Sequence, residues 1–347
     1  MREILSDLDN WFSKKEPVAL ATVVQTWGSS PRGLAAKMAL TQDGKISGSV
    51  SGGCVEGAVF EAGVEVLRSG RPQLLHFGVA DETAWSVGLA CGGQVDVFVQ
   101  PLDEAFFALQ RSELRAGRSF VVATIIQGPA YLLGKDLLIT RERRIYHSIA
   151  AGLDEAIVEQ ARQSLMSGIS KTVRLETSVK ESVDVFIEVQ NPQPVLVMVG
   201  GVHIAIALTS IARSLGFRTI VIDPRKAFGS AERFSHADQL IQLWPDDAFE
   251  NVALTEKTAI AILTHDPKID DPALKIALSS PAFYVGALGS DTTQAKRRAR
   301  LTEAGLSQDQ LARLHGPIGL KLGASNPEEI ALAVMAEIVA VQHKTIH

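Results

Sequence analysis

Two cysteines are the residues of this chain best suited to covalent or metal chemistry, and both stand beside paired glycines. Cys54 lies in the segment 49–56 (SVSGGCVE), and Cys91 is followed by Gly92 and Gly93. Glycine-rich turns bring backbone N–H groups close to a ligand. A helix is predicted directly after Cys54, and the positive end of its dipole favours a reactive thiolate. We interpret both cysteines as candidate catalytic residues and metal contacts; the alternative is that they are small buried side chains.

A second polar loop follows the predicted strand Val18–Val24 and has the sequence WGSSPRG at positions 27–33. The hydroxyls of Ser29 and Ser30 and the guanidinium of Arg32 are donors that suit a phosphate. The alternative is an ordinary surface turn, because glycine, serine and proline all favour turns.

Three glycine-rich turns, at 28–33, 48–54 and 88–93, each stand next to a predicted strand. If the strands bring them to one end of a sheet, the turns enclose a pocket. That pocket would hold both thiols, Arg32 and the backbone donors of Gly52, Gly53, Gly92 and Gly93.

The composition is that of an ordinary globular chain of 347 residues, 46% hydrophobic and 21% charged, with a net charge of −5. This length allows two or three domains. The negative charge argues against nucleic acid as a partner, and the absence of a long apolar run argues against a membrane span. Two cysteines do not make a disulfide framework, so a cytoplasmic location is expected. The apolar content leaves room for a homodimer interface, and no internal repeat is expected.

Prolines divide the chain at Asn191–Pro194, so we predict an N-terminal domain at 1–190 and a C-terminal domain at 195–347. The N-terminal domain is predicted to be α/β, opening with an amphipathic helix. Its later helices are expected at 105–115 and 154–166, and its later strands at 120–126, 137–140, 172–175 and 183–189.

The C-terminal domain is predicted to be a Rossmann-like, doubly wound parallel sheet. The apolar run Val195–Val199 is typical of a buried parallel strand, and it is followed by the turn GGVH at 200–203 and a helix. A second strand, Arg218–Ile222, ends at Asp223, where a ribose-binding carboxylate normally lies. Further strands are expected at Ala259–Leu263 and Ala282–Val285.

Nucleotide binding by this domain is not expected, because Val202 stands where the dinucleotide fingerprint needs its second glycine. His203 begins the helix, where it could face a ligand or help to cap the turn. His265 and Asp266 follow a strand as a candidate acid–base pair. The alternative is that Asp266 caps a helix whose first residue is Pro267.

Taken together and in order, these segments resemble the XdhC/CoxI family, whose members are accessory proteins for molybdenum hydroxylases such as xanthine dehydrogenase. The match runs from about Val18 to the C-terminus. It rests on GSSPR at 28–32, SGGCVE at 51–56, CGG at 91–93, GGVH at 200–203, DPR at 223–225, THD at 264–266, GALGS at 286–290, PIGL at 317–320 and PEEI at 327–330.

The resemblance implies a cytoplasmic factor that binds molybdenum cofactor (molybdopterin), supports its sulfuration with a cysteine desulfurase, and inserts it into the hydroxylase apoenzyme. Such a chain is a maturation chaperone more than a stand-alone enzyme. Cys54 and Cys91 would contact molybdenum or carry sulfur to it. The cofactor-binding candidates are Ser29, Ser30, Arg32, Gly52, Gly53, Gly92, Gly93, Gly200, Gly201, His203, Asp223, Arg225, Gly289 and Ser290.

This sequence departs from the family's usual pattern at three positions: Val202 and Ala205 where glycine is common, and Asp291 where arginine is usual. Losing a glycine and a cation weakens the case for an anionic phosphate at this edge. Two rival functions stay open. The first is an NAD(P)-dependent oxidoreductase that uses Asp223 and His265, and the second is a docking scaffold with no ligand.

Overall fold

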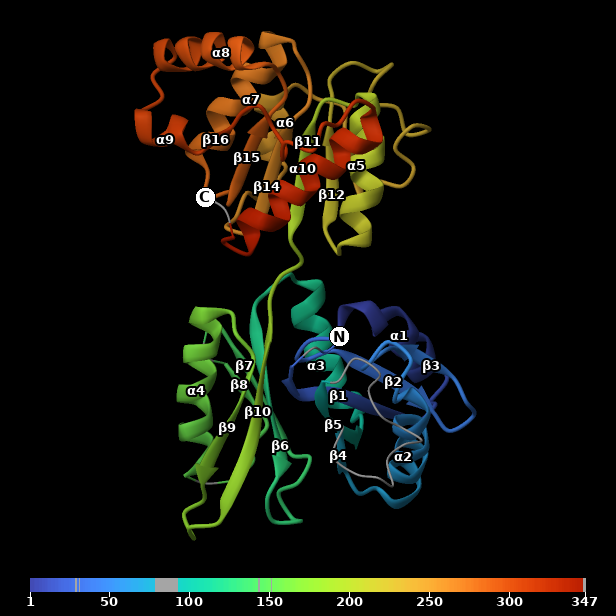
Figure 1. Cartoon of the computed structure of the whole chain (residues 1–347). Helices are drawn as coiled ribbons and strands as arrows, with labels where there is room; N and C mark the ends of the chain where they lie inside the picture. Colours follow the sequence, from blue (N-terminus) through green and yellow to red (C-terminus); the bar gives the residue numbers. More distant parts are fainter. Residues whose placement is uncertain (29, 31, 79–92, 143, 151, 346–347) are drawn as a thin grey trace. The chain divides into compact units, whose positions relative to one another are not determined.

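The computed structural model describes residues 1–28, 30, 32–78, 93–142, 144–150 and 152–345. The chain divides into two compact units, Met1–Pro192 and Gln193–His347 (Figure 1). Within the described residues, no helix has both the length and the apolar character needed to span a membrane.

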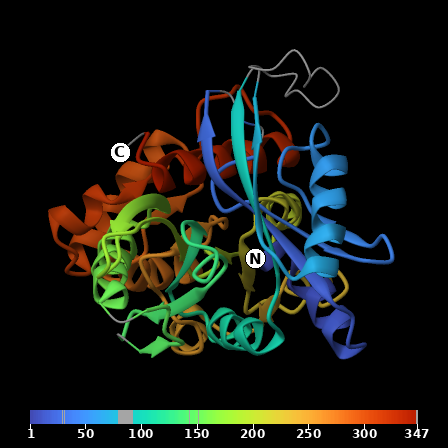
Figure 2. The ribbon, with the colours of Figure 1, turned by 90° about the horizontal axis from the view of Figure 1, so that it is seen from below.

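The N-terminal unit contains two five-stranded antiparallel sheets, each with one long helix on its outer face. The first sheet has the order β3-β2-β1-β5-β4, and Figure 2 shows α2, in light blue, beside its blue and cyan strands. Its elements are β1 (Val18–Trp27), β2 (Lys37–Thr41), β3 (Ile46–Gly48), α2 (Glu56–Ser69), β4 (Gln73–Phe77) and β5 (Gln94–Pro101).

The second sheet has the order β8-β7-β6-β10-β9. Its elements are β6 (Phe120–Gln127), β7 (Asp136–Thr140), β8 (Ile145–Tyr146), α4 (Leu153–Ser167), β9 (Lys171–Glu176) and β10 (Ser182–Gln190). The helices η1 (Arg2–Ile4), α1 (Leu5–Ser13) and α3 (Glu104–Arg115) supply the apolar cluster that closes one end of the space between the sheets.

The two sheets are copies of one motif, so the expectation of no internal repeat is wrong. Adding five to each strand number of the first sheet gives the order of the second, and in both the helix follows the third strand. The same irregularity recurs too. The pairing of β1 with β5 skips a residue between Val23 and Gln25, and β6 skips the matching residue between Ile125 and Gln127.

Two short sequence segments recur in both copies of the motif. ATVVQ at 21–25 in β1 corresponds to ATIIQ at 123–127 in β6, and VDVF occurs at 95–98 in β5 and again at 183–186 in β10. In each copy, alternate residues of these strands pack against the outer helix and the others face the opposite sheet.

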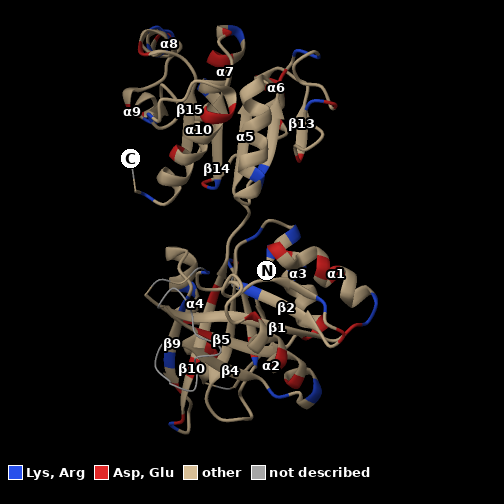
Figure 3. Cartoon of the chain, turned by 45° about the vertical axis from the view of Figure 1, so that its right-hand side comes forward, with Lys and Arg blue, Asp and Glu red and all other residues tan. Residues whose placement is uncertain are grey.

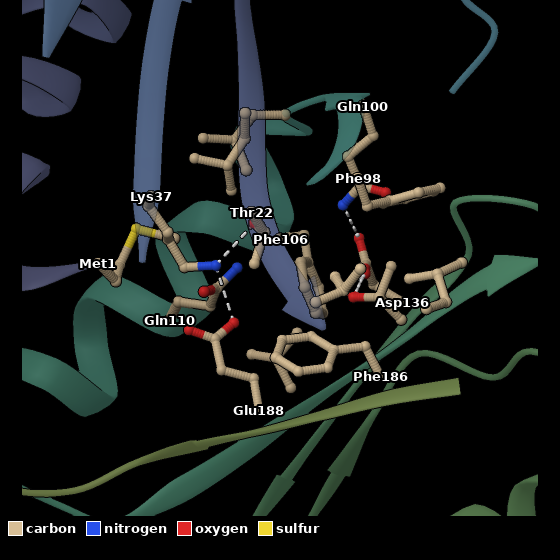
Figure 4. Close-up of a pocket in the computed structure, with 16 residues that line it drawn as sticks. Met1, Thr22, Lys37, Phe98, Gln100, Phe106, Gln110, Asp136, Phe186 and Glu188 are labelled. Atoms are coloured by element: carbon tan, nitrogen blue, oxygen red, sulfur yellow. Dashed lines mark hydrogen bonds and ion pairs between the residues drawn. The ribbon is translucent and has the colours of Figure 1, made fainter. Parts of the chain in front are cut away.

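The space between the two sheets contains a polar cluster built from equivalent positions of the repeat (Figure 4). Lys37 of β2 reaches Glu188 of β10 at 2.9 Å, and both side chains are almost fully buried. In the reciprocal contact, Gln100 of β5 donates to Asp136 of β7 at 3.1 Å. Such exchanged contacts are what a twofold relation between two copies produces. The cavity lined by this cluster is about 20 Å³, the room of one water molecule and too small for a pterin.

Burial raises the pKa of Asp136 from 3.8 to about 7, although hydrogen bonds from Thr124 and Gln100 oppose the shift. Between these two pH values the folded protein binds a proton that the unfolded chain does not, so stability falls as pH rises toward 7. We expect Asp136→Asn to remove this slope. Urea unfolding of both proteins at pH 5 and pH 8 checks it, and an identical pH dependence in the variant would exclude the effect.

The C-terminal unit is a six-stranded parallel sheet with the order β13-β12-β11-β14-β15-β16, which confirms the predicted Rossmann-like domain. Its strands are β11 (Val195–Val199), β12 (Arg218–Ile222), β13 (Gln239–Ile241), β14 (Thr258–Ile262), β15 (Tyr284–Ala287) and β16 (Leu314–His315).

Helices cover both faces of this sheet. The helices α5 (His203–Ser214) and α10 (Pro327–Gln342) pack on one face. On the other face lie α6 (Pro245–Glu250), α7 (Pro267–Ser279), α8 (Asp291–Glu303) and α9 (Gln308–Ala312). Figure 3 shows that segments with Lys and Arg and segments with Asp and Glu occur along the ribbons of both units.

Candidate functional site

Cys54 stands at the tip of the loop that joins β3 to α2, and its thiol is free and exposed. The helix begins two residues later, at Glu56. The loop turns sharply because Gly52 and Gly53 both have positive φ, at 83° and 123°. The structure thus places Cys54 on the predicted glycine turn, and its exposure excludes the alternative of a small buried side chain.

The Glu56 carboxylate occupies the centre of this loop. It accepts backbone N–H groups from Ser51 at 2.9 Å, Gly52 at 3.0 Å and Gly53 at 2.9 Å. It also accepts the hydroxyl groups of Ser49 at 2.7 Å and Ser51 at 2.5 Å. The Gly52 and Gly53 amides, expected to bind cofactor, therefore donate to the side chain of Glu56, the first residue of α2.

The hydrogen bonds to Glu56 favour its ionised form. Partial burial alone would raise its pKa, but the hydrogen bonds from Ser51, Ser49 and the backbone outweigh burial and lower the pKa to about 2. The negative charge of the Glu56 carboxylate also complements the positive end of the α2 dipole.

Arg32 joins the second polar loop to the Cys54 loop. Its Nε donates to the Ser49 carbonyl at 3.1 Å, and its Nη2 forms an ion pair with Glu3 at 2.5 Å. Ser30 turns inward on its own loop, where its hydroxyl donates to the Arg32 carbonyl at 2.7 Å. About a third of the Arg32 side chain is exposed, so a cationic group lies beside the loop that presents the thiol.

Two of the three predicted turns thus meet, and the last residue of the third, Gly93, directly precedes β5. Trp27, the last residue of β1, pairs with Gln94, the first residue of β5, and Gly93 immediately before it is buried. Ser29, Cys91 and Gly92 lie outside the described residues.

At the C-terminal edge of the parallel sheet, Asp223 is fully buried and binds groups of its own domain. Its carboxylate accepts the Gly201 amide at 2.7 Å and pairs with the Arg225 guanidinium through Nη2 at 2.7 Å and Nε at 2.9 Å. Burial alone would raise the pKa of Asp223, but these bonds together lower it. The carboxylate that would receive a ribose is thus occupied by Arg225.

The segment after Asp223 folds back over the glycine turn at 200–203. A methyl group added at Gly201 would lie 2.5 Å from the Phe228 carbonyl oxygen and 3.1 Å from the Phe234 ring. The Arg225 guanidinium in turn stacks on the Phe228 ring, 4.1 Å from its centroid. This glycine therefore allows close approach of the protein's own backbone at the place where a pyrophosphate would bind.

We expect Gly201→Ala to destabilise the C-terminal unit by about 1–3 kcal/mol, because the Phe228 backbone must move to admit a methyl group. Gly57→Ala is the control, since Gly57 in α2 has no atom within 4 Å of an added Cβ. Urea unfolding measures both. Equal free energies of unfolding for Gly201→Ala and the wild type would show that the backbone around Phe228 admits the methyl group without cost.

Two of the other candidates at this edge cap helices, and two histidines are exposed. Asp266 caps α7, where it accepts the Lys268 amide at 3.0 Å, and among the described residues no hydrogen bond joins it to the exposed His265. Ser290, which follows Gly289, caps α8 by accepting the Thr293 amide at 3.3 Å. His203, at the start of α5, is exposed.

Sequence reasoning overlooked Glu56 although the residue belongs to the segment 49–56 that contains Cys54. A signal was present, because an acidic residue in the first turn of a helix after a serine-rich turn often binds the preceding amides. The ion pair between Asp223 and Arg225 could also have been predicted, since the two residues are two positions apart in the sequence.

Two family descriptions match this chain: the XdhC and CoxI family at residues 11–78, and the XdhC Rossmann domain at residues 196–338. Together they cover more than half of the chain, which therefore belongs to the XdhC and CoxI family.

The names of individual relatives are consistent with this family. A Bacillus subtilis (strain 168) protein, named as a probable subunit of xanthine dehydrogenase, is 28% identical over 342 residues, 97% of each chain. The Escherichia coli (strain K12) molybdenum cofactor insertion chaperone PaoD is 25% identical over 93% of this chain and 83% of its own. A solved Bacillus halodurans protein, described as a xanthine dehydrogenase, shares the fold with a TM-score of 0.79 and 23% identity. The match covers 99% of this chain and 96% of that one.

Proposed function

We propose that this protein binds molybdenum cofactor at the Cys54 end of its N-terminal unit and inserts it into a molybdenum hydroxylase of the xanthine dehydrogenase type. The observation that carries the proposal is the exposed thiol of Cys54 on a loop fixed by Glu56, next to the guanidinium of Arg32. The similarity to PaoD supports the same cargo.

The donor set suits this cargo. Thiolates are soft ligands and favour soft or sulfide-bearing metal centres, whereas a guanidinium forms paired hydrogen bonds with phosphate. Cys54 would contact the molybdenum centre, and Arg32 would exchange its ion pair with Glu3 for the phosphate of the pterin. We also propose Cys91 for this site, because its turn directly precedes β5 in the sequence.

The rival function as an NAD(P)-dependent oxidoreductase receives no support from the C-terminal unit. Arg225 occupies the Asp223 carboxylate, and the Phe228 carbonyl lies over Gly201. We propose that this unit is a structural domain and does not bind a nucleotide.

Delivery to the hydroxylase completes the proposal. A cysteine desulfurase would supply the sulfur added to the cofactor while this protein holds it, and both partners would act in the cytoplasm. We also propose that the protein forms a homodimer, which sedimentation of the same preparations would detect.

Purification of the protein under anaerobic conditions, from cells that make the cofactor, tests this function. We expect pterin fluorescence and molybdenum to co-purify with the chain. A preparation that binds its hydroxylase partner but carries neither signal would favour the ligand-free scaffold and overturn the proposal.

A further inference from the structure

The internal repeat supplies a second copy of the Cys54 loop without a cysteine. This loop, described at residues 147–150 and 152, joins β8 to α4 as the Cys54 loop joins β3 to α2. The acidic residue that binds it is Asp154, whose carboxylate accepts the Ser148 hydroxyl at 2.5 Å and the Ile149 and Ala150 amides at 2.9 and 3.2 Å.

Glu56 makes the same three contacts in its own copy. It accepts the Ser49 hydroxyl at 2.7 Å and the Val50 and Ser51 amides at 3.2 and 2.9 Å. Among the described residues, these three bonds are therefore common to both copies.

The remaining contacts of Glu56 go to the residues that flank Cys54. It accepts the Gly52, Gly53 and Val55 amides at 3.0, 2.9 and 3.2 Å. The Ser51 hydroxyl, which donates to Glu56, in turn accepts the Cys54 amide at 3.1 Å. The longer acidic side chain thus holds the backbone on both sides of the cysteine.

We infer that Glu56 is a positioning residue that fixes the Cys54 thiol, a role beyond the turn-building role it shares with Asp154. The inference deepens the proposed function, since the fixed thiol is the group assigned to the molybdenum centre.

Spin labelling of Cys54 in a Cys91→Ser background tests the inference without cofactor. In Glu56→Gln, one carboxylate oxygen becomes an amide group that cannot accept, so the flanking residues lose bonds. We expect the correlation time of the nitroxide to shorten at least about twofold, as nanosecond loop motion is released. Asp154→Asn is the matched control, and there the label should keep the wild-type spectrum.

Unchanged mobility in Glu56→Gln would overturn the inference, as would an equal change in Asp154→Asn. If Glu56→Gln does not fold, Ser51→Ala removes the hydroxyl that binds the Cys54 amide and must give the same increase in mobility. A cofactor titration of the unlabelled proteins is a separate readout. Increased mobility with unchanged cofactor affinity would support positioning by Glu56 and contradict the proposed contact with molybdenum.

Discussion

Replacing Cys54 by serine is expected to weaken cofactor binding and activation of the partner hydroxylase by at least about tenfold. The reason is chemical: a hydroxyl is a poor ligand for a soft metal centre, and losing even an outer partner of a metal site costs about 10–100-fold. Serine nearly preserves the size of the side chain on an exposed loop, so folding should not change. Fluorescence titration with molybdenum cofactor and reconstitution of the apoenzyme measure the two effects.

Cys91→Ser is the companion variant. We expect it to reduce activation less than Cys54→Ser or to a similar extent. Full cofactor binding and full activation in both variants would exclude a role for the thiols.

Replacing Lys37 by methionine is expected to destabilise the N-terminal unit by about 3–5 kcal/mol, because Glu188 is left as a buried charge without its partner. Lys37 and Glu188 are 2% and 4% exposed, and the Lys37 ammonium also donates to Thr22 at 3.0 Å. The pair joins one copy of the repeat to the other, so its loss should weaken the packing of the two sheets. Urea unfolding provides the measurement.

Lys45→Met is the control, because the ion pair of Lys45 with Glu16 is partly exposed and such pairs contribute at most about 1 kcal/mol. Adding Glu188→Gln to Lys37→Met should recover part of the stability by removing the isolated charge. Equal midpoints for Lys37→Met and Lys45→Met would contradict the account of the buried pair.

The C-terminal fold could be predicted because its central strands are continuous apolar runs buried on both faces. The strands Val195–Val199 and Arg218–Ile222 have the predicted bounds. The short edge strands β13 and β16 carry no such run, and no pattern indicated them. Their pairing depends on neighbours that the sequence does not reveal.

The repeat of the N-terminal unit was missed because its two copies agree in pattern more than in identity. What is shared is alternation of apolar residues, which many unrelated strands share. The words ATVVQ and ATIIQ at 21–25 and 123–127 were visible but short. Only the sheet order and the reciprocal contacts of Lys37 and Asp136 make the duplication plain.

The candidate site was predictable in its residue types and not in its hydrogen bonds. The expectation that Arg32 lies near the Cys54 loop agrees with its bond to Ser49. The glycine amides, by contrast, bind Glu56, and Asp223 binds Arg225, because a neighbouring charged side chain satisfies these groups within the fold. A sequence reports donors and acceptors but not which of them the folded chain has already paired.

We propose that the cofactor binds at the Cys54 end of the N-terminal unit and not at the edge of the parallel sheet. Anaerobic titration of the full chain with molybdenum cofactor tests it most directly, with Cys54→Ser and Arg32→Ala compared with His203→Ala and His265→Ala. All four side chains are at least partly exposed, so each variant should fold. We expect an affinity loss of about tenfold or more in Cys54→Ser and Arg32→Ala and wild-type affinity in the two histidine variants. The reverse pattern would contradict it.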